Sequence, residues 1–106
     1  MDAQIKRGLL EVCVLAALSR GDSYGYRIIK DIEPYIAISE STLYPILRRL
    51  EEGNMLTVYS MEHNGRLRKY YQITDNGRFR LSGFDEEWNE ILNIYRFITG
   101  EVESNE

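Results

Sequence analysis

The chain has 106 residues, of which 43% are apolar and 28% charged, and its formal net charge is −4. This length and composition fit one globular domain with a modest core and argue against two domains. The single cysteine, Cys13, cannot form an internal disulfide, so no oxidising compartment is required and we expect a cytoplasmic protein.

The acidic charge is unevenly distributed along the chain. Residues 1–81 hold 12 basic and 10 acidic side chains, a balance of +2, whereas residues 82–106 hold 1 basic and 7 acidic side chains, a balance of −6. Net charge alone argues against a nucleic-acid partner. The distribution nevertheless leaves room for a local basic surface outside the C-terminal segment.

The first predicted helix spans residues 4–19 and is apolar on nearly every side. Two basic residues before its apolar run imitate a secretory signal, but Glu11 interrupts the run and the segment is too short to cross a bilayer. We therefore expect no membrane association. A helix that is apolar all round must be covered all round, which favours packing of Leu9 and Cys13 against a second subunit.

A second helix is expected between Gly21 and Pro34, with Asp22 or Ser23 as its N-cap. The stretch YIAIS, which follows Pro34, predicts a short extended strand before the helical pattern begins again.

The third predicted helix, residues 39–52, carries an apolar stripe on one side. Pro45 removes a backbone hydrogen bond from its interior, a cost that proteins usually accept where function gains. The N-terminal end of such a helix meets phosphates and base edges when it reads DNA. Its outward side supplies the candidate DNA contacts Ser41, Thr42, Tyr44, Arg48 and Arg49. The alternative is a slightly bent surface helix on which the two arginines pair with Glu51 or Glu52.

Two β-prone runs flank the Asn-Gly dipeptide at residues 64–65, the strongest short signal for a hairpin with a type I′ turn. This turn pairs Leu56 with Ile73 on a core side and Tyr59 with Tyr70 on the other side. The second side is basic and aromatic.

This hairpin is a candidate wing, a β-hairpin whose cations neutralise phosphates beside a recognition helix in the major groove. Its tyrosines would stack or donate hydrogen bonds to the DNA backbone. The alternative is a solvated hairpin with ordinary surface arginines. The wing residues that we expect at the DNA are Arg66, Arg68 and Lys69.

The last predicted helix begins after the capping residue Thr74 and carries an apolar heptad seam that needs a partner. Gly83 weakens this helix by about 1 kcal/mol relative to alanine, so packing must hold it. Beyond Gly100 the tail is polar and expected to fray. The seam favours a dimer interface formed by Leu81, Phe84, Trp88, Ile91, Tyr95 and Ile98.

Trp88 permits a sharper hypothesis. Paired with its symmetry mate, it would make a flat aromatic slot for a planar effector. The alternative is that the aromatic stripe is simply core, carried across a two-fold axis.

No pattern in the sequence indicates a catalytic site. His63 is the single histidine, Cys13 lies in the most apolar helix, and neither zinc-ligand spacing nor a Gly-rich phosphate loop appears. We expect no catalytic residue, no metal and no cofactor. A winged-helix adaptor that binds protein instead of DNA and, more remotely, an enzyme are the competing hypotheses.

The order of helix, helix, short strand, helix, strand, turn, strand and long helix is that of a winged helix-turn-helix. We therefore predict a mainly α fold with a small β-hairpin and a long C-terminal dimerisation helix. Residues 1–73 would form the DNA-binding domain, and residues 74–106 the dimerisation helix and a frayed tail.

Four stretches together resemble the PadR family of bacterial transcriptional regulators: RGLLEVCVLAALSRGDSYGYRIIKDI, SESTLYPILRRLEE, GRLRKYYQITDNGR and EEW. The match covers residues 4 to about 98 in unbroken order, and the combination of YGY, TLYPILRRLE and RKYYQIT is far more specific than any one piece. The resemblance implies a homodimeric winged-helix repressor that binds an inverted-repeat operator in double-stranded DNA, often beside its own gene. It also implies the subgroup with a short C-terminal helix, which is swapped against the partner's first helix.

The resemblance implies particular site residues as well. Family members often lose DNA on binding phenolic or planar aromatic compounds, and in some the tryptophan matching Trp88 lines the dimer pocket. The family's DNA contacts map onto Tyr24, Tyr26, Ser41, Thr42, Tyr44, Arg66, Arg68 and Lys69.

The chain departs from the family pattern at two places. Ser41 stands where glycine is common, which changes how closely the backbone can approach a phosphate. Gly53 comes one place early in the usual EEEG ending, so that Asn54 takes the glycine position. Asparagine tolerates the left-handed conformation, so we expect the turn to survive.

Overall fold

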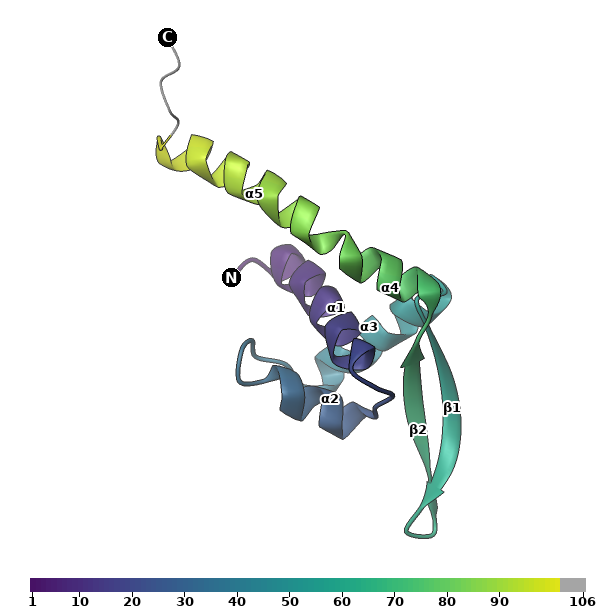
Figure 1. The fold of residues 1–106 in the computed structure, drawn as a ribbon. Helices are drawn as coiled ribbons and strands as arrows, with labels where there is room; N and C mark the ends of the chain where they lie inside the picture. The colour runs from purple at the N-terminus through teal and green to yellow at the C-terminus, as the bar shows by residue number, and fades with distance from the viewer. Residues whose placement is uncertain (102–106) are drawn as a thin grey trace.

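The computed structural model describes residues 1–101 and confirms a mainly helical chain with one β-hairpin (Figure 1). The expectation of a frayed tail falls mostly on residues 102–106, which lie outside the described residues. In chain order the elements are α1 (Ala3–Ser19), α2 (Gly25–Ile32), α3 (Glu40–Glu52), β1 (Leu56–His63), β2 (Arg66–Ile73), α4 (Asp75–Ser82) and α5 (Phe84–Thr99).

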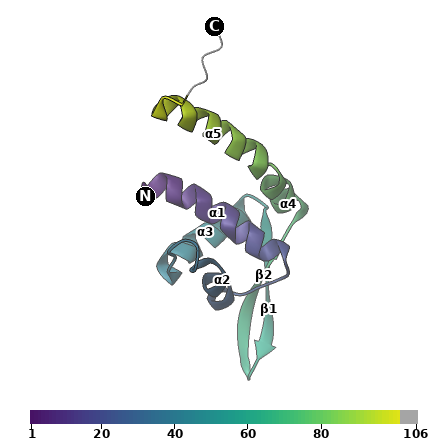
Figure 2. The same ribbon diagram turned by 60° about the vertical axis from the view of Figure 1, so that its left-hand side comes forward.

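The hydrophobic core lies where α1, α2 and α3 meet the base of the hairpin (Figure 2). From α1 it takes Leu10, Val14, Leu15 and Leu18. The apolar stripe predicted on α3 is buried, with at most 3% of each residue exposed: Leu43, Ile46, Leu47 and Leu50. The third helix is therefore fixed against the core along its whole length, which leaves its opposite side free.

The hairpin has the predicted register. β1 and β2 pair antiparallel from Leu56 opposite Ile73 to His63 opposite Arg66. The turn residues at positions 64 and 65 have φ of 52° and 79°, as a type I′ turn requires. Asn54 also takes the expected left-handed conformation, with φ of 60°. We call β1, the turn and β2 the wing.

The third extended segment lies elsewhere than predicted. Residues 35–39 form no strand; Ile36 and Ile38 pack one by one against the core, so their alternation comes from packing and not from strand pairing. The segment that pairs with the wing is Ser23. Its N–H donates to the Tyr71 carbonyl at 3.1 Å, and the Tyr71 N–H donates to the Ser23 carbonyl at 2.7 Å.

The prediction of an Asp22 or Ser23 cap on α2 was also wrong. Tyr24 is the N-cap and makes no side-chain capping hydrogen bond. Both predicted caps have other partners: the backbone of Ser23 is bonded to the wing, and the Asp22 carboxylate accepts a hydrogen bond from Tyr59 at 2.6 Å.

The single helix predicted after Thr74 is divided at Gly83 into α4 and α5. Gly83 has φ of −79° and ψ of −6°. This ψ departs from the value of about −42° that is typical of an α-helix. The hydrogen bonds from Gly83 N to the Phe79 carbonyl and from Glu87 N to the Gly83 carbonyl are both 3.2 Å long. The break is therefore local, and α5 continues from α4.

α4 clamps the base of the wing. Thr74 caps it as predicted: its Oγ1 accepts from Gly77 N at 3.1 Å and donates to the Asn54 carbonyl at 2.7 Å. Gly77 is buried, and a Cβ there would collide with the Met55 carbonyl and lie 2.7 Å from the Ile73 side chain. Only glycine lets the helix approach the wing this closely.

We predict that Gly77→Ala destabilises the fold by about 1–3 kcal/mol, because the backbone of Met55 has to move to admit the methyl group. Gly83→Ala is the matched control. The nearest atoms to its Cβ are 3.7 Å away, so helix propensity should stabilise this variant by up to about 1 kcal/mol. Denaturant unfolding measures both, and equal stability of Gly77→Ala and the parent protein would contradict the clamp.

Candidate nucleic-acid interface

Three elements border an open groove of about 600 Å³: the N-terminal ends of α2 and α3 and the strand β2 of the wing. The wing and α2 lie at the end of the molecule opposite α5 (Figures 1 and 2). The lining residues are Tyr24, Gly25, Tyr26, Glu40, Tyr44, Leu67, Arg68, Lys69 and Tyr71.

The first turn of α3 presents a cluster of hydroxyl groups. Ser39 Oγ lies 3.0 Å from Ser41 Oγ and 3.2 Å from Thr42 Oγ1, and all three residues are exposed. The backbone N–H groups at the start of a helix lack intrahelical partners and carry the positive end of its dipole. Together with the hydroxyls they provide donors for an anionic group, whereas Glu40 in the same turn provides an acceptor.

The two exposed tyrosines of the groove come from different helices. Tyr26 of α2 is 62% exposed and Tyr44 of α3 is 42% exposed. Gly25 leaves room for Tyr44 between the two helix ends, because a Cβ at this position would collide with the Tyr44 hydroxyl and lie 3.1 Å from its Cζ. The glycine of the YGY stretch therefore admits the Tyr44 ring at its observed position.

Arg68 is packed among aromatic rings. Its guanidinium carbon lies 3.6 Å from the ring centroid of Tyr24. Its Nε and Nη2 donate to the Tyr70 hydroxyl at 3.1 and 2.8 Å. The Tyr70 ring stacks on Tyr59 at 5.6 Å between centroids and meets Tyr24 edge-on at 5.7 Å. One side of the wing is thus fastened to the start of α2.

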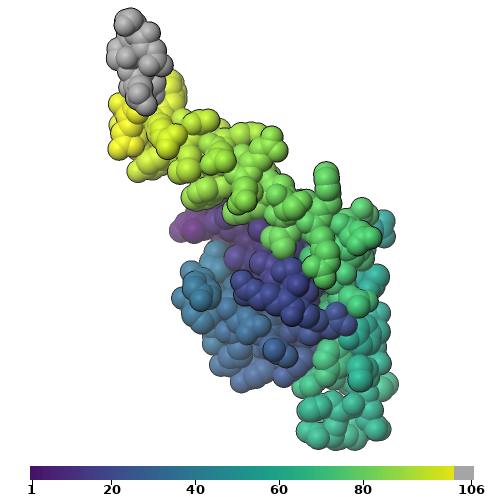
Figure 3. Space-filling view, viewed as in Figure 1, coloured from purple at the N-terminus to yellow at the C-terminus, as the bar shows by residue number. Residues whose placement is uncertain are grey.

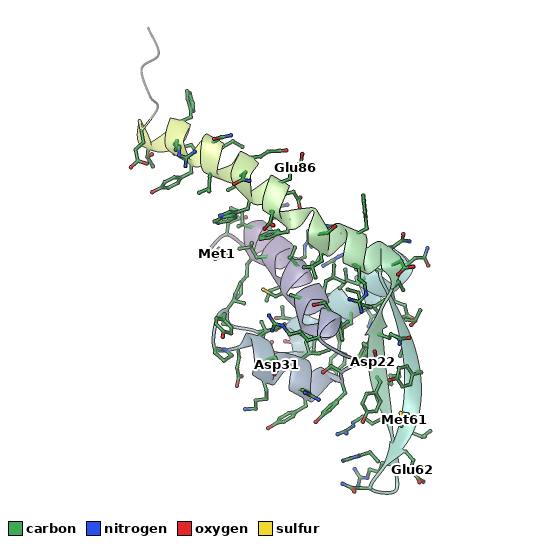
Figure 4. The ribbon with its side chains drawn as sticks, viewed as in Figure 1. Met1, Asp22, Asp31, Met61, Glu62 and Glu86 are labelled. Carbon is green, nitrogen blue, oxygen red and sulfur yellow. The ribbon has the colours of Figure 1, made fainter. Side chains whose placement is uncertain are left out.

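A hydrogen bond extends this aromatic cluster to the turn before α2, where Figure 4 labels Asp22 beside the hairpin. The Tyr59 hydroxyl donates to Asp22 Oδ2 at 2.6 Å, and this bond is the main cause that raises the pKa of Tyr59 above its ordinary value. Burial likewise raises the pKa of Tyr71. Both hydroxyls therefore stay protonated at neutral pH.

The predicted contact residues do not all gather at the groove. Arg49 Nε donates to Glu11 Oε2 at 2.8 Å, so this arginine joins α3 to α1 and not to either neighbouring glutamate of α3. Arg48 lies with Tyr44 and Lys69 around a smaller hollow beside the groove. Arg48 and Arg49 therefore have different surroundings, although the sequence analysis assigned the same DNA-contacting role to both.

Four groove residues escaped the sequence analysis: Gly25, Glu40, Leu67 and Tyr71. Leu67 is 79% exposed although strand alternation places it on the same side as the buried Tyr71. The reason is that the wing extends beyond the end of the core. The glycine between two tyrosines was the available signal for Gly25.

A second candidate surface lies on α5, which has no buried residue and projects from the rest of the molecule (Figure 3). On the predicted seam, Trp88 is 44% exposed, and the Phe84 and Trp88 rings stack at 6.1 Å between centroids. Further along, Ile91, Tyr95 and Ile98 are 46%, 53% and 72% exposed. On α1 the predicted interface residues Leu9 and Cys13 are partly exposed.

Among residues 1–101, no group of three or more histidine, cysteine, aspartate or glutamate side chains is placed to hold a metal ion. Within the same range, every helix falls short of the length and apolar character that crossing a bilayer requires.

Comparison with known proteins points to one family of transcriptional regulators. The model of the "Transcriptional regulator PadR-like family" matches residues 14–83. A transcriptional regulator from Clostridium thermocellum has 32% identity and a TM-score of 0.80, over 91% of this chain and 95% of that one. The protein smu.1704 from Streptococcus mutans UA159 has 42% identity and a TM-score of 0.76, over 92% of each chain.

A more distant similarity is to Bacillus subtilis PadR, whose structure was solved in complex with operator DNA. The identity is 23% and the TM-score 0.66, over 72% of this chain and 45% of that chain. At this identity the similarity shows a common fold.

Proposed function

The chain belongs to the PadR-like family of transcriptional regulators, and we propose that it is a dimeric repressor that binds an inverted-repeat operator. One observation carries this proposal: Tyr44 of α3 and the wing cations Arg68 and Lys69 line the same open groove. The exposed hydroxyl cluster stands at the start of the same helix. Residues 1–73 would bind DNA and residues 74–106 would hold two copies together. Such a protein acts where the chromosome is, in line with the cytoplasmic location expected from its lone cysteine.

In the proposed complex, α3 enters the major groove with its N-terminal end first. Ser41, Thr42 and Tyr44 then meet phosphates and base edges, and Tyr24 and Tyr26 meet the sugar-phosphate backbone beside them. The burial of the opposite side of α3 in the core supports this orientation.

The wing supplies the main electrostatic contribution. Arg66 and Lys69 are exposed, and neither forms a salt bridge within residues 1–101. Both are therefore available for phosphates. Arg48 of α3 lines the same small hollow as Lys69 of the wing. The complex of Bacillus subtilis PadR with operator DNA supports the use of this fold on a duplex.

The dimer is proposed from the seam on α5. An apolar stripe of this size on a single chain marks an interaction surface, and heptad spacing suits another helix. Two copies related by a two-fold axis would present two α3 helices to successive half-sites about one helical turn apart. This geometry accounts for an inverted repeat.

We also propose an aromatic effector at Trp88. The side chain is nearly half exposed and stacked on Phe84, so it presents aromatic surface to a planar phenolic or drug-like compound. In a dimer the two tryptophans would form the two walls of a slot. Release of DNA would follow if the slot reorients the two DNA-binding units.

We predict salt-dependent binding to the promoter region upstream of the protein's own gene, measured by fluorescence anisotropy. Each phosphate contact contributes about −0.9 to the slope of log K against log [salt]. Arg66→Gln and Lys69→Gln should each weaken binding and reduce the slope by about 0.9 per bound subunit. Arg78→Gln, an exposed cation on α4, is the control. Salt-independent binding, or equal affinity for random duplex, would favour a protein-binding adaptor instead.

We predict that Ile91→Glu dissociates the dimer in sedimentation equilibrium, because the charge would be buried once per subunit. The dissociation constant should rise at least about a hundredfold. Asn89→Glu changes the opposite side of α5 and should leave the dimer intact. If the parent protein is monomeric at micromolar concentration, the seam has been misassigned.

We predict that a phenolic or planar compound quenches the fluorescence of Trp88, the single tryptophan of the chain. The same compound should release the duplex in the anisotropy assay, and Trp88→Ala should abolish that release. Failure of a chemically varied panel to quench would remove the support for an effector at this position.

A further inference from the structure

Arg68 differs from the other wing cations in its surroundings. Its guanidinium lies flat enough on Tyr24 to place the central carbon 3.6 Å from the ring centroid. Two of its N–H donors are already used by the Tyr70 hydroxyl, and the side chain is partly buried. Arg66 and Lys69, by contrast, extend from the wing as exposed side chains.

The contacts of Arg68 join two elements that are far apart in the sequence. Tyr24 is the N-cap of α2, whereas Arg68 and Tyr70 lie on β2. The adjacent backbone pair between Ser23 and Tyr71 makes the same connection. Arg68 therefore lies beside a joint between the helix-turn-helix and the wing.

Such a joint matters because a two-stranded hairpin is marginally stable by itself. The half of the wing nearest the turn extends beyond the core, and its side chains are exposed except for the partly buried Arg68. A loose wing would have to be ordered on binding DNA, at an entropic cost that reduces affinity. Fastening it beforehand avoids that cost.

We propose that Arg68 is a positioning residue that locks the wing onto α2, so that Arg66 and Lys69 stand at a fixed distance from α3. In this assignment Arg68 does not itself neutralise a phosphate, although its cationic character suggested that role. The inference rests on the proposed function and specifies how the DNA-binding surface is pre-formed.

Arginine-to-lysine variants separate the two roles. Lysine keeps the charge and can replace a phosphate contact, but it has neither a planar face for Tyr24 nor the forked donors for Tyr70. In the promoter-duplex assay we expect Arg68→Lys to lose about tenfold in affinity, whereas the matched control Arg66→Lys stays within about twofold. The salt slope of Arg68→Lys should remain that of the parent protein.

A double-variant cycle tests the partner. Tyr70→Phe removes the acceptor without changing any charge, and it should weaken binding by no more than Arg68→Lys, which also loses the contact with Tyr24. Because both changes break the contact between Arg68 and Tyr70, the double variant should lose no more than the weaker-binding single variant. Additive losses would mean that the two side chains act separately and would overturn the lock.

A measurement without DNA decides the lock independently. Hydrogen exchange of the Ser23 and Tyr71 amides reports local opening of the joint. In Arg68→Lys and Tyr70→Phe it should accelerate by roughly fivefold or more, and in Arg66→Lys it should not change. Parent-like exchange in Arg68→Lys, or parent-like affinity for the duplex, overturns the proposal. If the parent protein binds no duplex, the proposed function fails, and accelerated exchange would still support the lock.

Discussion

The antiparallel backbone pair between Ser23 and Tyr71 is the constraint on which the functional surface depends. It joins the turn before α2 to the strand that leaves the wing, at 3.1 and 2.7 Å. Because strand residues alternate in direction, fixing Tyr71 against the core also fixes the opposite side of β2. That side carries the Arg68 and Tyr70 cluster, and the wing consequently borders the same groove as α3.

The two ends of the molecule carry different interactions. At one end the groove combines tyrosines and wing cations, whereas at the other end α5 presents apolar side chains and most of the acidic residues of the C-terminal segment. A net charge of −4 therefore does not describe the surface that we propose meets DNA. The acidic residues of α5 would stay away from the phosphates and would help to orient the protein on them.

Much of the fold follows from short-range rules that the sequence displays. The Asn-Gly dipeptide determined the wing register, and spacing identified the buried stripe of α3. The errors arose where tertiary contacts compete with local preference. Ser23 pairs with the wing instead of capping α2, and the alternation of residues 35–39 reflects individual packing. The last helix is divided at Gly83 because the ψ angle there departs from the helical value, and helix propensity alone does not predict where this happens.

The candidate site was less predictable than the fold. Residue type marked Arg48, Arg49, Arg66 and Arg68 as equivalent cations, yet Arg49 pairs with Glu11 and Arg68 stacks on Tyr24. Both partners are distant in sequence, so no local pattern reveals them.

The most direct test of the central claim is an amide NMR titration of the protein with its promoter duplex. The account predicts that shifts concentrate at the N-terminal ends of α2 and α3 and along the wing, while the amides of α5 keep their positions. Shifts centred on α5, with the groove unaffected, would contradict it.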